Sequence, residues 1–299
     1  MATAVICEFN PFHNGHKYLL ESAKNVLKEP VIAIMSGSFT QRGEVAVCDK
    51  FVRAKSALEN GADLVLELPV VFSLSGAEGF AKAGVAIASA FECTNHLAFG
   101  SEIGDCELLK KSANAVCDER VQALVRDGMK NGGYYPRELE NAVKTVFGDE
   151  ISSVLCEPNN ILGVEYIKAL NSTGVEPFSV ARSGVAHDSR IAGEGFASAS
   201  HIREMLRNGE NAKKYAPYIP DEITFPENLD RPLLYRLRTI TRDDIAKLPD
   251  VGEGLENRIA DAAVRCSTSS EIADLVKTKR YTHARIRRIL ACALLEIEK

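Results

Sequence analysis

The stretch that decides the fold is Glu8-Phe9-Asn10-Pro11-Phe12-His13-Asn14-Gly15-His16. It follows a short apolar run, residues 3–9, that predicts a buried strand, and it leads into residues 14–27, where apolar side chains recur at helical spacing. A helix N-terminus offers unpaired backbone N–H groups and the positive end of the helix dipole, so this junction is suited to bind phosphate. Gly15 lets a ligand approach the backbone closely. His13 and His16 lie on one side of the first turn, where they can donate to charge growing on a phosphate under attack.

A single histidine at such a position has a second interpretation. His16 shares a helix face with Leu19 and Ala23, and a lone histidine there is more often a packed core residue. The spacing H-x-G-H at a strand-to-helix junction favours the phosphate site instead.

Strands and helices alternate through the first hundred residues. Further strands are predicted at 30–35, 63–68 and 95–99, and further helices at 49–60 and 75–90. Helices of this length between strands predict consecutive βαβ units and a parallel sheet. Ligands bind beyond the carboxyl ends of the strands in such sheets. We therefore expect the loops after Phe9, Met35, Leu68 and Phe99 to surround the site.

The rest of the chain becomes increasingly helical. Residues 102–141 are predicted to be helical with a break at 131–133, and a helix at 160–170 and a strand at 177–181 follow. A glycine-containing polar loop is expected at 183–195 and a helix at 198–207. After the prolines at 217, 220 and 226 the pattern is mostly helical. We therefore expect an α/β domain over residues 1–225 and a helical domain over 226–299.

Composition narrows the class of protein. No apolar run approaches the roughly 20 residues of a membrane helix, and the N-terminus lacks the basic start of a signal peptide, so a cytoplasmic protein is expected. The eight cysteines include no C-x-x-C pair, and we expect reduced thiols rather than a metal site.

Charge is divided unevenly along the chain. Residues 231–299 hold 14 lysines and arginines against 10 acidic residues, a net charge of +4, whereas the remainder holds 22 against 31, a net charge of −9. The basic run is Lys277-Thr278-Lys279-Arg280-Tyr281-Thr282-His283-Ala284-Arg285-Ile286-Arg287-Arg288. Cations with an interleaved tyrosine suit phosphate neutralisation and base stacking, so Lys279, Arg280, Arg285 and Arg288 are predicted RNA contacts. The alternative is a solvated helix face.

The H-x-G-H stretch resembles the HIGH-type nucleotidyltransferase superfamily, which joins adenylyltransferases and class I aminoacyl-tRNA synthetases. The resemblance implies a Rossmann-like α/β domain with a second phosphate-binding loop late in the domain. The matching segment is Ala197-Ser198-Ala199-Ser200-His201-Ile202-Arg203. Ser198 and Ser200 can cap the helix and meet phosphate oxygens, and Arg203 can steady the leaving pyrophosphate. An ordinary capped surface helix is the alternative for this segment.

Six separated blocks extend the resemblance over most of the chain. They cover residues 8–16, 35–44, 60–69, 99–102, 158–163 and 253–259. In this order they resemble the bacterial tRNA(Met) cytidine acetate ligase family. The resemblance implies that acetate and ATP form acetyl-adenylate and pyrophosphate, and that the acetyl group then moves to N4 of the wobble cytidine of elongator tRNA(Met). It also implies that family members extend beyond residue 299, so part of the RNA-binding surface is expected outside this sequence.

The resemblance assigns site residues where the motifs align. His13, His16 and Arg203 are expected to be catalytic. Nucleotide contacts are expected from Ile6, Cys7, Glu8, Phe9, Asn10, Pro11, Phe12, Asn14, Gly15, Leu19, Gly100, Asn159, Arg182 and Ser200. Taken without the family, Gly100, Asn159 and Arg182 also fit a turn glycine, a helix cap and a surface arginine.

Two other functions share these features. A small-molecule adenylyltransferase would use the same H-x-G-H chemistry but would not need a basic helical tail. A non-catalytic RNA-binding module would use the histidines only as phosphate contacts. Magnesium is expected to accompany ATP because the phosphates need charge neutralisation, although the sequence shows no dedicated set of carboxylate ligands.

Overall fold

A five-stranded parallel sheet forms the centre of the computed structural model, which describes residues 1–182, 195–219 and 222–299. The strands are β1 (Ala2–Cys7), β2 (Val31–Ser36), β3 (Leu64–Leu68), β4 (Thr94–Ser101) and β5 (Glu176–Ala181). Their order is β3-β2-β1-β4-β5, with every neighbouring pair parallel. The predicted parallel α/β sheet is thus confirmed, and β1 lies at its centre. The loop predicted at 183–195 falls almost entirely outside the described residues.

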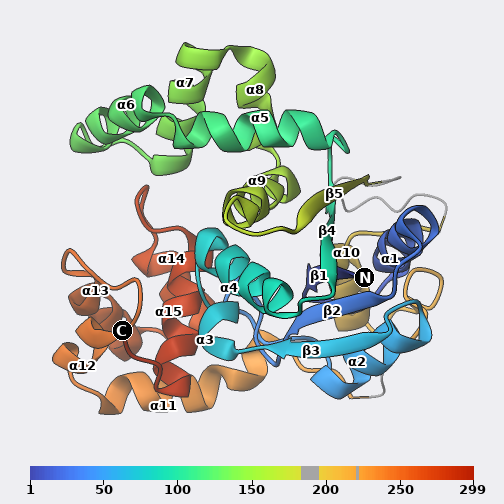
Figure 1. Ribbon diagram of the computed structural model, residues 1–299. Helices are drawn as coiled ribbons and strands as arrows, with labels where there is room; N and C mark the ends of the chain where they lie inside the picture. The colour runs from blue at the N-terminus through green and yellow to red at the C-terminus, as the bar shows by residue number, and fades with distance from the viewer. Residues whose placement is uncertain (183–194, 220–221) are drawn as a thin grey trace.

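Helices cover both faces of the sheet (Figure 1). On one face lie α1 (Asn14–Leu27) and α2 (Lys50–Glu59), and on the other lie α4 (Ala77–Ala90) and α9 (Pro158–Leu170). Side chains alternate along β1, so Ile6 packs into the cluster under α4 and α9, whereas Val5 packs into the cluster under α1. Both faces of β1 are therefore buried, which explains why the strand reads as a continuous apolar run.

The helical region after β4 forms an arm beyond the sheet. It contains α5 (Cys106–Cys117), α6 (Glu119–Lys130), α7 (Tyr135–Phe147), α8 (Asp149–Ser153) and the 3₁₀ turn η1 (Val154–Cys156). The predicted break at 131–133 separates α6 from α7. A second break, which was not predicted, lies at Asp118, because this residue leaves the helix and its carboxylate caps α6 by accepting from the Arg120 N–H at 2.9 Å.

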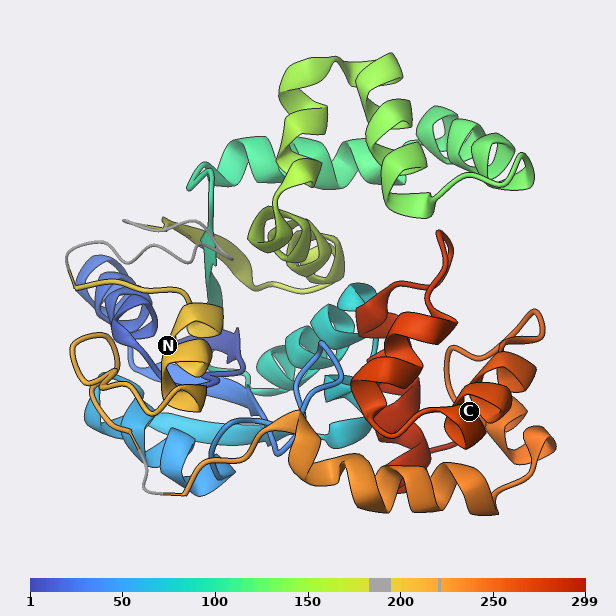
Figure 2. The same cartoon turned by 180° about the vertical axis from the view of Figure 1, so that it is seen from behind.

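The C-terminal helices have a hydrophobic cluster of their own. After α10 (Ala199–Arg207) and η2 (Pro226–Leu229) come α11 (Asp230–Thr239), α12 (Arg242–Lys247), α13 (Leu255–Arg265), α14 (Ser269–Val276) and α15 (His283–Leu295). Their buried residues, among them Leu237, Ile259 and Ile286, form a cluster that draws only on residues 233–293. Figure 2 shows these helices beside the sheet, below the α5–α8 arm. The expected domain boundary near residue 225 stays a prediction.

One short helix links the sheet to the C-terminal helices. A turn of helix, α3 (Val70–Ser73), precedes α4 and was not predicted. It joins Leu74, Ala291 and Cys292 in a small buried cluster that packs α15 against the sheet unit. Among the described residues, no helix is both long enough and apolar enough to cross a membrane.

A buried arginine ties together the carboxyl ends of β1 and β2. Arg53 on α2 is 1% exposed. Its guanidinium donates to the carbonyls of Glu8 at 2.6 Å, Ser36 at 3.1 Å and Cys48 at 3.2 Å, and also to that of Gly37. One side chain therefore supplies donors to buried backbone acceptors in two connections, the loop after β1 and the segment from the end of β2 to α2.

Replacing Arg53 with Met should lower the free energy of unfolding by about 3 kcal/mol or more, because each buried carbonyl left without a donor costs about 1–3 kcal/mol. Urea unfolding would measure this loss. The matched control is Arg126→Met, at an exposed position of α6, which should change stability by less than about 0.5 kcal/mol. Equal losses in the two variants would contradict the role of Arg53.

Candidate active site

A cavity of about 300 Å³ opens at the carboxyl edge of the sheet. Its walls come from the ends of β1, β4 and β5, the first turn of α1, and the starts of α9 and α10. Most of the predicted nucleotide-site residues line it: Ile6, Cys7, Glu8, Phe9, Asn10, His13, Gly15, His16, Leu19, Gly100, Asn159, Arg182, Ser200 and Arg203. Tertiary structure thus brings together residues separated by almost 200 positions in the chain.

Three predicted contacts are not among the residues that line this cavity. Phe12 is 1% exposed and packs edge-on against Phe9 in the core. Asn14 donates its side-chain amide to the carbonyls of Gly195 at 2.8 Å and Lys214 at 3.0 Å, so it holds the chain that follows β5. Pro11 lies in the turn that immediately precedes Phe12. Phe12 and Asn14 therefore stabilise the segments around the cavity without lining it.

His13 and His16 form a reciprocal cap at the start of α1. His13 Nδ1 accepts from the Gly15 N–H at 3.1 Å, and His16 Nδ1 accepts from the His13 N–H at 3.2 Å. The rings stack with their centroids 3.6 Å apart and their planes 20° from parallel. Because each Nδ1 is an acceptor, each neutral ring carries its proton on Nε2. The helix cap thereby fixes both tautomers as Nε2–H donors.

Both imidazoles are uncharged at neutral pH. Burial, followed by the positive charges of Arg182 and Arg203, lowers the pKa of His13 to about 3. Burial, His13 and Arg182 likewise hold the pKa of His16 well below its usual range. The pair can therefore donate hydrogen bonds to an anion but is too weakly basic to accept a proton near pH 7.

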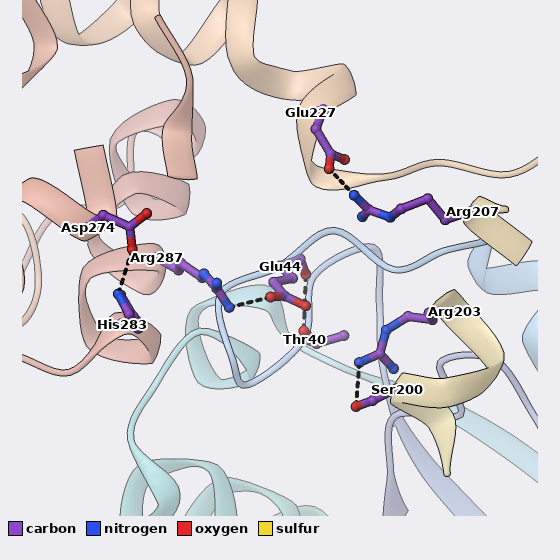
Figure 3. Close-up of polar contacts among 9 residues, drawn as sticks. All are labelled: Thr40, Glu44, Ser200, Arg203, Arg207, Glu227, Asp274, His283 and Arg287. Atoms are coloured by element: carbon purple, nitrogen blue, oxygen red, sulfur yellow. Dashed lines mark hydrogen bonds and ion pairs between the residues drawn. The ribbon is translucent and has the colours of Figure 1, made fainter. Parts of the chain in front are cut away.

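Arginines on α10 and directly after β5 supply positive charge to the cavity. Arg203 on α10 donates to the carbonyl of Asn10 at 2.8 Å and to the Ser200 hydroxyl at 3.2 Å (Figure 3). Ser198 caps the same helix by accepting from the His201 N–H at 3.1 Å. Arg182 follows β5, and its buried Nε has no hydrogen-bond partner among the described residues. An unpaired guanidinium N–H beside two imidazole donors is suited to an anionic ligand.

The other wall of the cavity is ordered by Glu102. Its carboxylate accepts from the Asn159 side-chain amide at 2.5 Å and from the Asn160 N–H at 3.0 Å. The Asn160 side chain in turn accepts from the Glu102 N–H at 3.0 Å. These bonds join the end of β4, just after Gly100, to the first turn of α9, and they orient Asn159 toward the cavity.

Residues 39–45 form part of the cavity that the sequence did not assign. Thr40, Gln41, Arg42 and Glu44 all line it. The Gln41 N–H donates to the Glu8 carboxylate at 2.5 Å, and burial raises the pKa of that carboxyl group. The sequence indicated only that these residues follow the second predicted strand, in one of the loops expected to surround the site. Without the tertiary contacts, no individual residue could be chosen.

The predicted RNA contacts divide into two groups. The Arg280 guanidinium pairs with the exposed Glu253 at 3.1 Å. Arg285 donates to the Asp250 carbonyl at 2.6 Å while lying over the Tyr281 ring. Arg288 differs, since its side chain is 11% exposed and donates to the Gln41 carbonyl at 3.3 Å. Burial accordingly lowers the pKa of Arg288.

The expectation that Tyr281 stacks on bases needs correction. This side chain is 7% exposed, and its hydroxyl donates to the Gly252 carbonyl at 3.1 Å. A ring packed in this way has no open face for a base. The basic segment instead contributes to a second cavity, of about 900 Å³, which lies between residues 132–141 and 277–284. Lys277 and Lys279 line one side of it, and Arg137 lines the other.

Comparison with known proteins identifies the family. The family model described as HIGH Nucleotidyl Transferase matches residues 1–299. This chain belongs to the HIGH nucleotidyltransferase family. The tRNA(Met) cytidine acetate ligase of Clostridium tetani is 37% identical over 314 aligned residues, which cover 96% of this chain and 77% of the relative. That of Thermoanaerobacter sp. (strain X514) is 39% identical, covering 99% and 78%.

Experimental structures agree with this assignment. Thermotoga maritima TmcAL in its apo form superposes on this HIGH nucleotidyltransferase with a TM-score of 0.91 at 33% identity, over 100% of this chain and 76% of TmcAL. The form bound to alpha-thio ATP gives a TM-score of 0.90. The Rossmann-like fold implied by the resemblance is therefore confirmed.

The low pKa of His13 predicts a specific dependence of stability on pH. The unfolded chain binds a proton at His13 below about pH 6.5, whereas the folded protein does so only near pH 3. Stability should therefore fall as the pH drops through this window, by up to about 1.4 kcal/mol per pH unit. His13→Asn should reduce the decline between pH 7 and pH 5, measured by urea unfolding at each pH. Identical declines in parent and variant would contradict the buried, neutral state of this imidazole.

Proposed function

We propose that this chain is an ATP-dependent ligase that activates acetate and acetylates a tRNA. In the first step an acetate oxygen attacks the α-phosphorus of ATP, which yields acetyl-adenylate and releases pyrophosphate. In the second step N4 of the wobble cytidine of elongator tRNA(Met) attacks the acetyl carbonyl, loses a proton, and displaces AMP. The HIGH nucleotidyltransferase fold and relatives named tRNA(Met) cytidine acetate ligase support this proposal.

The observation that carries the proposal is the convergence of four hydrogen-bond donors, none of which is basic enough to accept a proton near neutral pH. His13 and His16 present neutral Nε2–H groups, and Arg182 and Arg203 lie close enough to depress the pKa of His13. Acetate is already an anion at neutral pH, so its attack requires no proton abstraction. What the reaction requires is stabilisation of the negative charge that grows on the α-phosphate oxygens, which preorganised donors supply.

Each remaining residue has a part that follows from its position. Arg203 and Ser200, joined at 3.2 Å, would hold the leaving pyrophosphate. Arg182, whose Nε has no hydrogen-bond partner in the part of the chain that the structure describes, would bind the phosphate chain. Gly100 and Asn159, on the wall ordered by Glu102, would meet the adenosine. Burial raises the pKa of the Cys7 thiol, so this cavity residue would serve as a contact and not as a nucleophile.

Magnesium would reach the site together with ATP. Within residues 1–182, 195–219 and 222–299, no group of three or more His, Cys, Asp or Glu side chains is arranged to hold a metal ion. The cavity carboxylates Glu8 and Glu44 are already engaged, by the Gln41 N–H and by Arg287 respectively. The phosphate oxygens and water would therefore be the main ligands of the ion.

The tRNA would bind at the second cavity. Its two sides carry Lys277, Lys279 and Arg137, which come from segments about 140 residues apart. Arg280 and Arg285 lie on the same basic segment, and a local cluster of cations is needed because the remainder of the chain carries a net charge of −9. Arg288 is buried against the hairpin of residues 39–45, so we assign it to that junction instead of to RNA.

His16→Ala should reduce formation of acetyl-adenylate by about 10²–10³-fold, in line with the loss of one preorganised donor. ATP binding should weaken far less, because other contacts to the nucleotide remain. Acetate-dependent exchange of pyrophosphate into ATP measures the rate. His283→Ala, at the exposed start of α15, is the control and should retain the parent rate. Near-normal turnover in a folded His16→Ala protein would contradict the assignment.

Charge reversal at Lys279 and Arg280 should abolish RNA acetylation and leave acetate-dependent pyrophosphate exchange intact. Each phosphate contact removed should also lower the salt dependence of RNA binding by roughly 0.7–0.9 in the log–log slope. The control reverses two cations on α12, Arg242 and Lys247, which lie at the far side of the same helical unit (Figure 1).

Loss of both half-reactions in the Lys279/Arg280 variant would indicate misfolding or a shared site. Loss of neither half-reaction would favour the alternative interpretation, in which the basic segment is a solvated helix face. Absence of RNA acetylation by the parent protein would instead favour a small-molecule acceptor over tRNA.

A further inference from the structure

The hairpin of residues 39–45 closes one side of the nucleotide cavity and is a defined structural unit. Phe39 and Val45 form an antiparallel bridge, and the Thr40 N–H donates to the Glu44 carbonyl at 2.9 Å. The Gly43 N–H donates to the Thr40 carbonyl at 2.9 Å. Gln41 and Arg42, at the tip, line the cavity, so the position of the hairpin determines where these side chains stand relative to a bound nucleotide.

One anchor of the hairpin lies inside the site. The Gln41 N–H donates to the carboxylate of Glu8 at 2.5 Å, directly after β1. The Gln41 side chain also reaches the Ser75 carbonyl at 3.4 Å. Arg42 is near enough to act electrostatically on Glu8. Movement of the hairpin would therefore displace a hydrogen-bond partner of Glu8, the residue directly after β1.

The second anchor comes from the C-terminal helix α15, about 240 residues later in the chain. Arg287 Nη1 donates to Glu44 Oε1 at 2.5 Å, as Figure 3 shows. Arg288 donates to the Gln41 carbonyl at 3.3 Å. Gly43, with φ of +78°, lies so close to α15 that a Cβ atom there would overlap the backbone of Arg287 and Arg288. The backbone of the hairpin therefore lies in close contact with the backbone of α15.

We propose that Arg287 is a positioning residue for acetate activation, acting through Glu44 to hold the hairpin of residues 39–45 against the nucleotide. This inference rests on the proposed function and adds that the C-terminal helices contribute to the first half-reaction as well as to RNA binding. Glu44 and Arg287 are partly desolvated, with side chains 22% and 38% exposed. Their contact is therefore screened less by solvent than an ion pair on the open surface.

The test is a double-mutant cycle on acetate-dependent pyrophosphate exchange. Arg287→Ala should lower kcat about 10–100-fold, because small displacements of positioning groups reduce rates by such factors, whereas the KM for ATP should change much less. If Arg287 acts through Glu44, adding Arg287→Ala to Glu44→Ala should cause little further loss. Arg287→Lys, which keeps the positive charge, should recover part of the rate. Arg287→Gln replaces the alanine variant if that protein does not fold.

The matched control is Arg236→Ala. Arg236 is 35% exposed and pairs with Glu296 at 3.2 Å just beyond the end of α15, so its ion-pair partner lies in the same helical unit and not in the hairpin. Its removal should leave exchange unchanged. A parent-like kcat in Arg287→Ala, or independent losses that multiply in the double variant, would overturn the inference. Absence of acetate-dependent exchange in the parent protein would overturn the proposed function instead, so the two failures are distinguishable.

Discussion

The structure depends most on a single buried guanidinium. Arg53 lies under the carboxyl edge of the sheet and donates to carbonyls in the loop after β1 and in the segment from the end of β2 to α2. In a parallel α/β sheet these loops hold the ligand, and their backbone leaves the regular hydrogen-bond ladder there. A charged donor with a planar fork can satisfy several such acceptors at once. Because the Glu8 backbone is held in this way, its side chain can serve as the anchor for Gln41.

Burial also explains the chemistry of the site. Removing His13 and His16 from water and placing them beside Arg182 and Arg203 makes their charged forms unfavourable, so both rings remain neutral donors. The positive charge needed to attract polyphosphate is carried by the arginines, which cannot deprotonate. The imidazole and guanidinium groups are thus suited to different functions. In the proposed reaction the arginines would bind charge already present in the substrate, and the histidines would donate to charge that develops in the transition state.

We propose two roles for the C-terminal helices. Their basic segment faces the arm that carries Arg137 across a large cavity, which gives an otherwise acidic protein a local surface for a polyanion. On another side, α15 meets the hairpin that borders the nucleotide. A tRNA docked on these helices would therefore lie on the unit that helps to shape the activation site. The proposed sites of the two half-reactions therefore lie within one connected structure.

The sequence by itself determined the features that depend on local order. The ends of α1 lie at the predicted residues, the parallel βαβ pattern follows from hydrophobic spacing, and the H-x-G-H turn stands where a strand meets a helix. Most of the residues named for the nucleotide site line its cavity. Only the tertiary structure decided that Arg288 and Tyr281 are buried, that the hairpin of residues 39–45 enters the site, and that Arg137 faces the basic segment. Helical or strand periodicity reports which face of an element is apolar, but a polar side chain is buried or exposed according to partners far away in the chain, and those partners meet it only when the fold is complete.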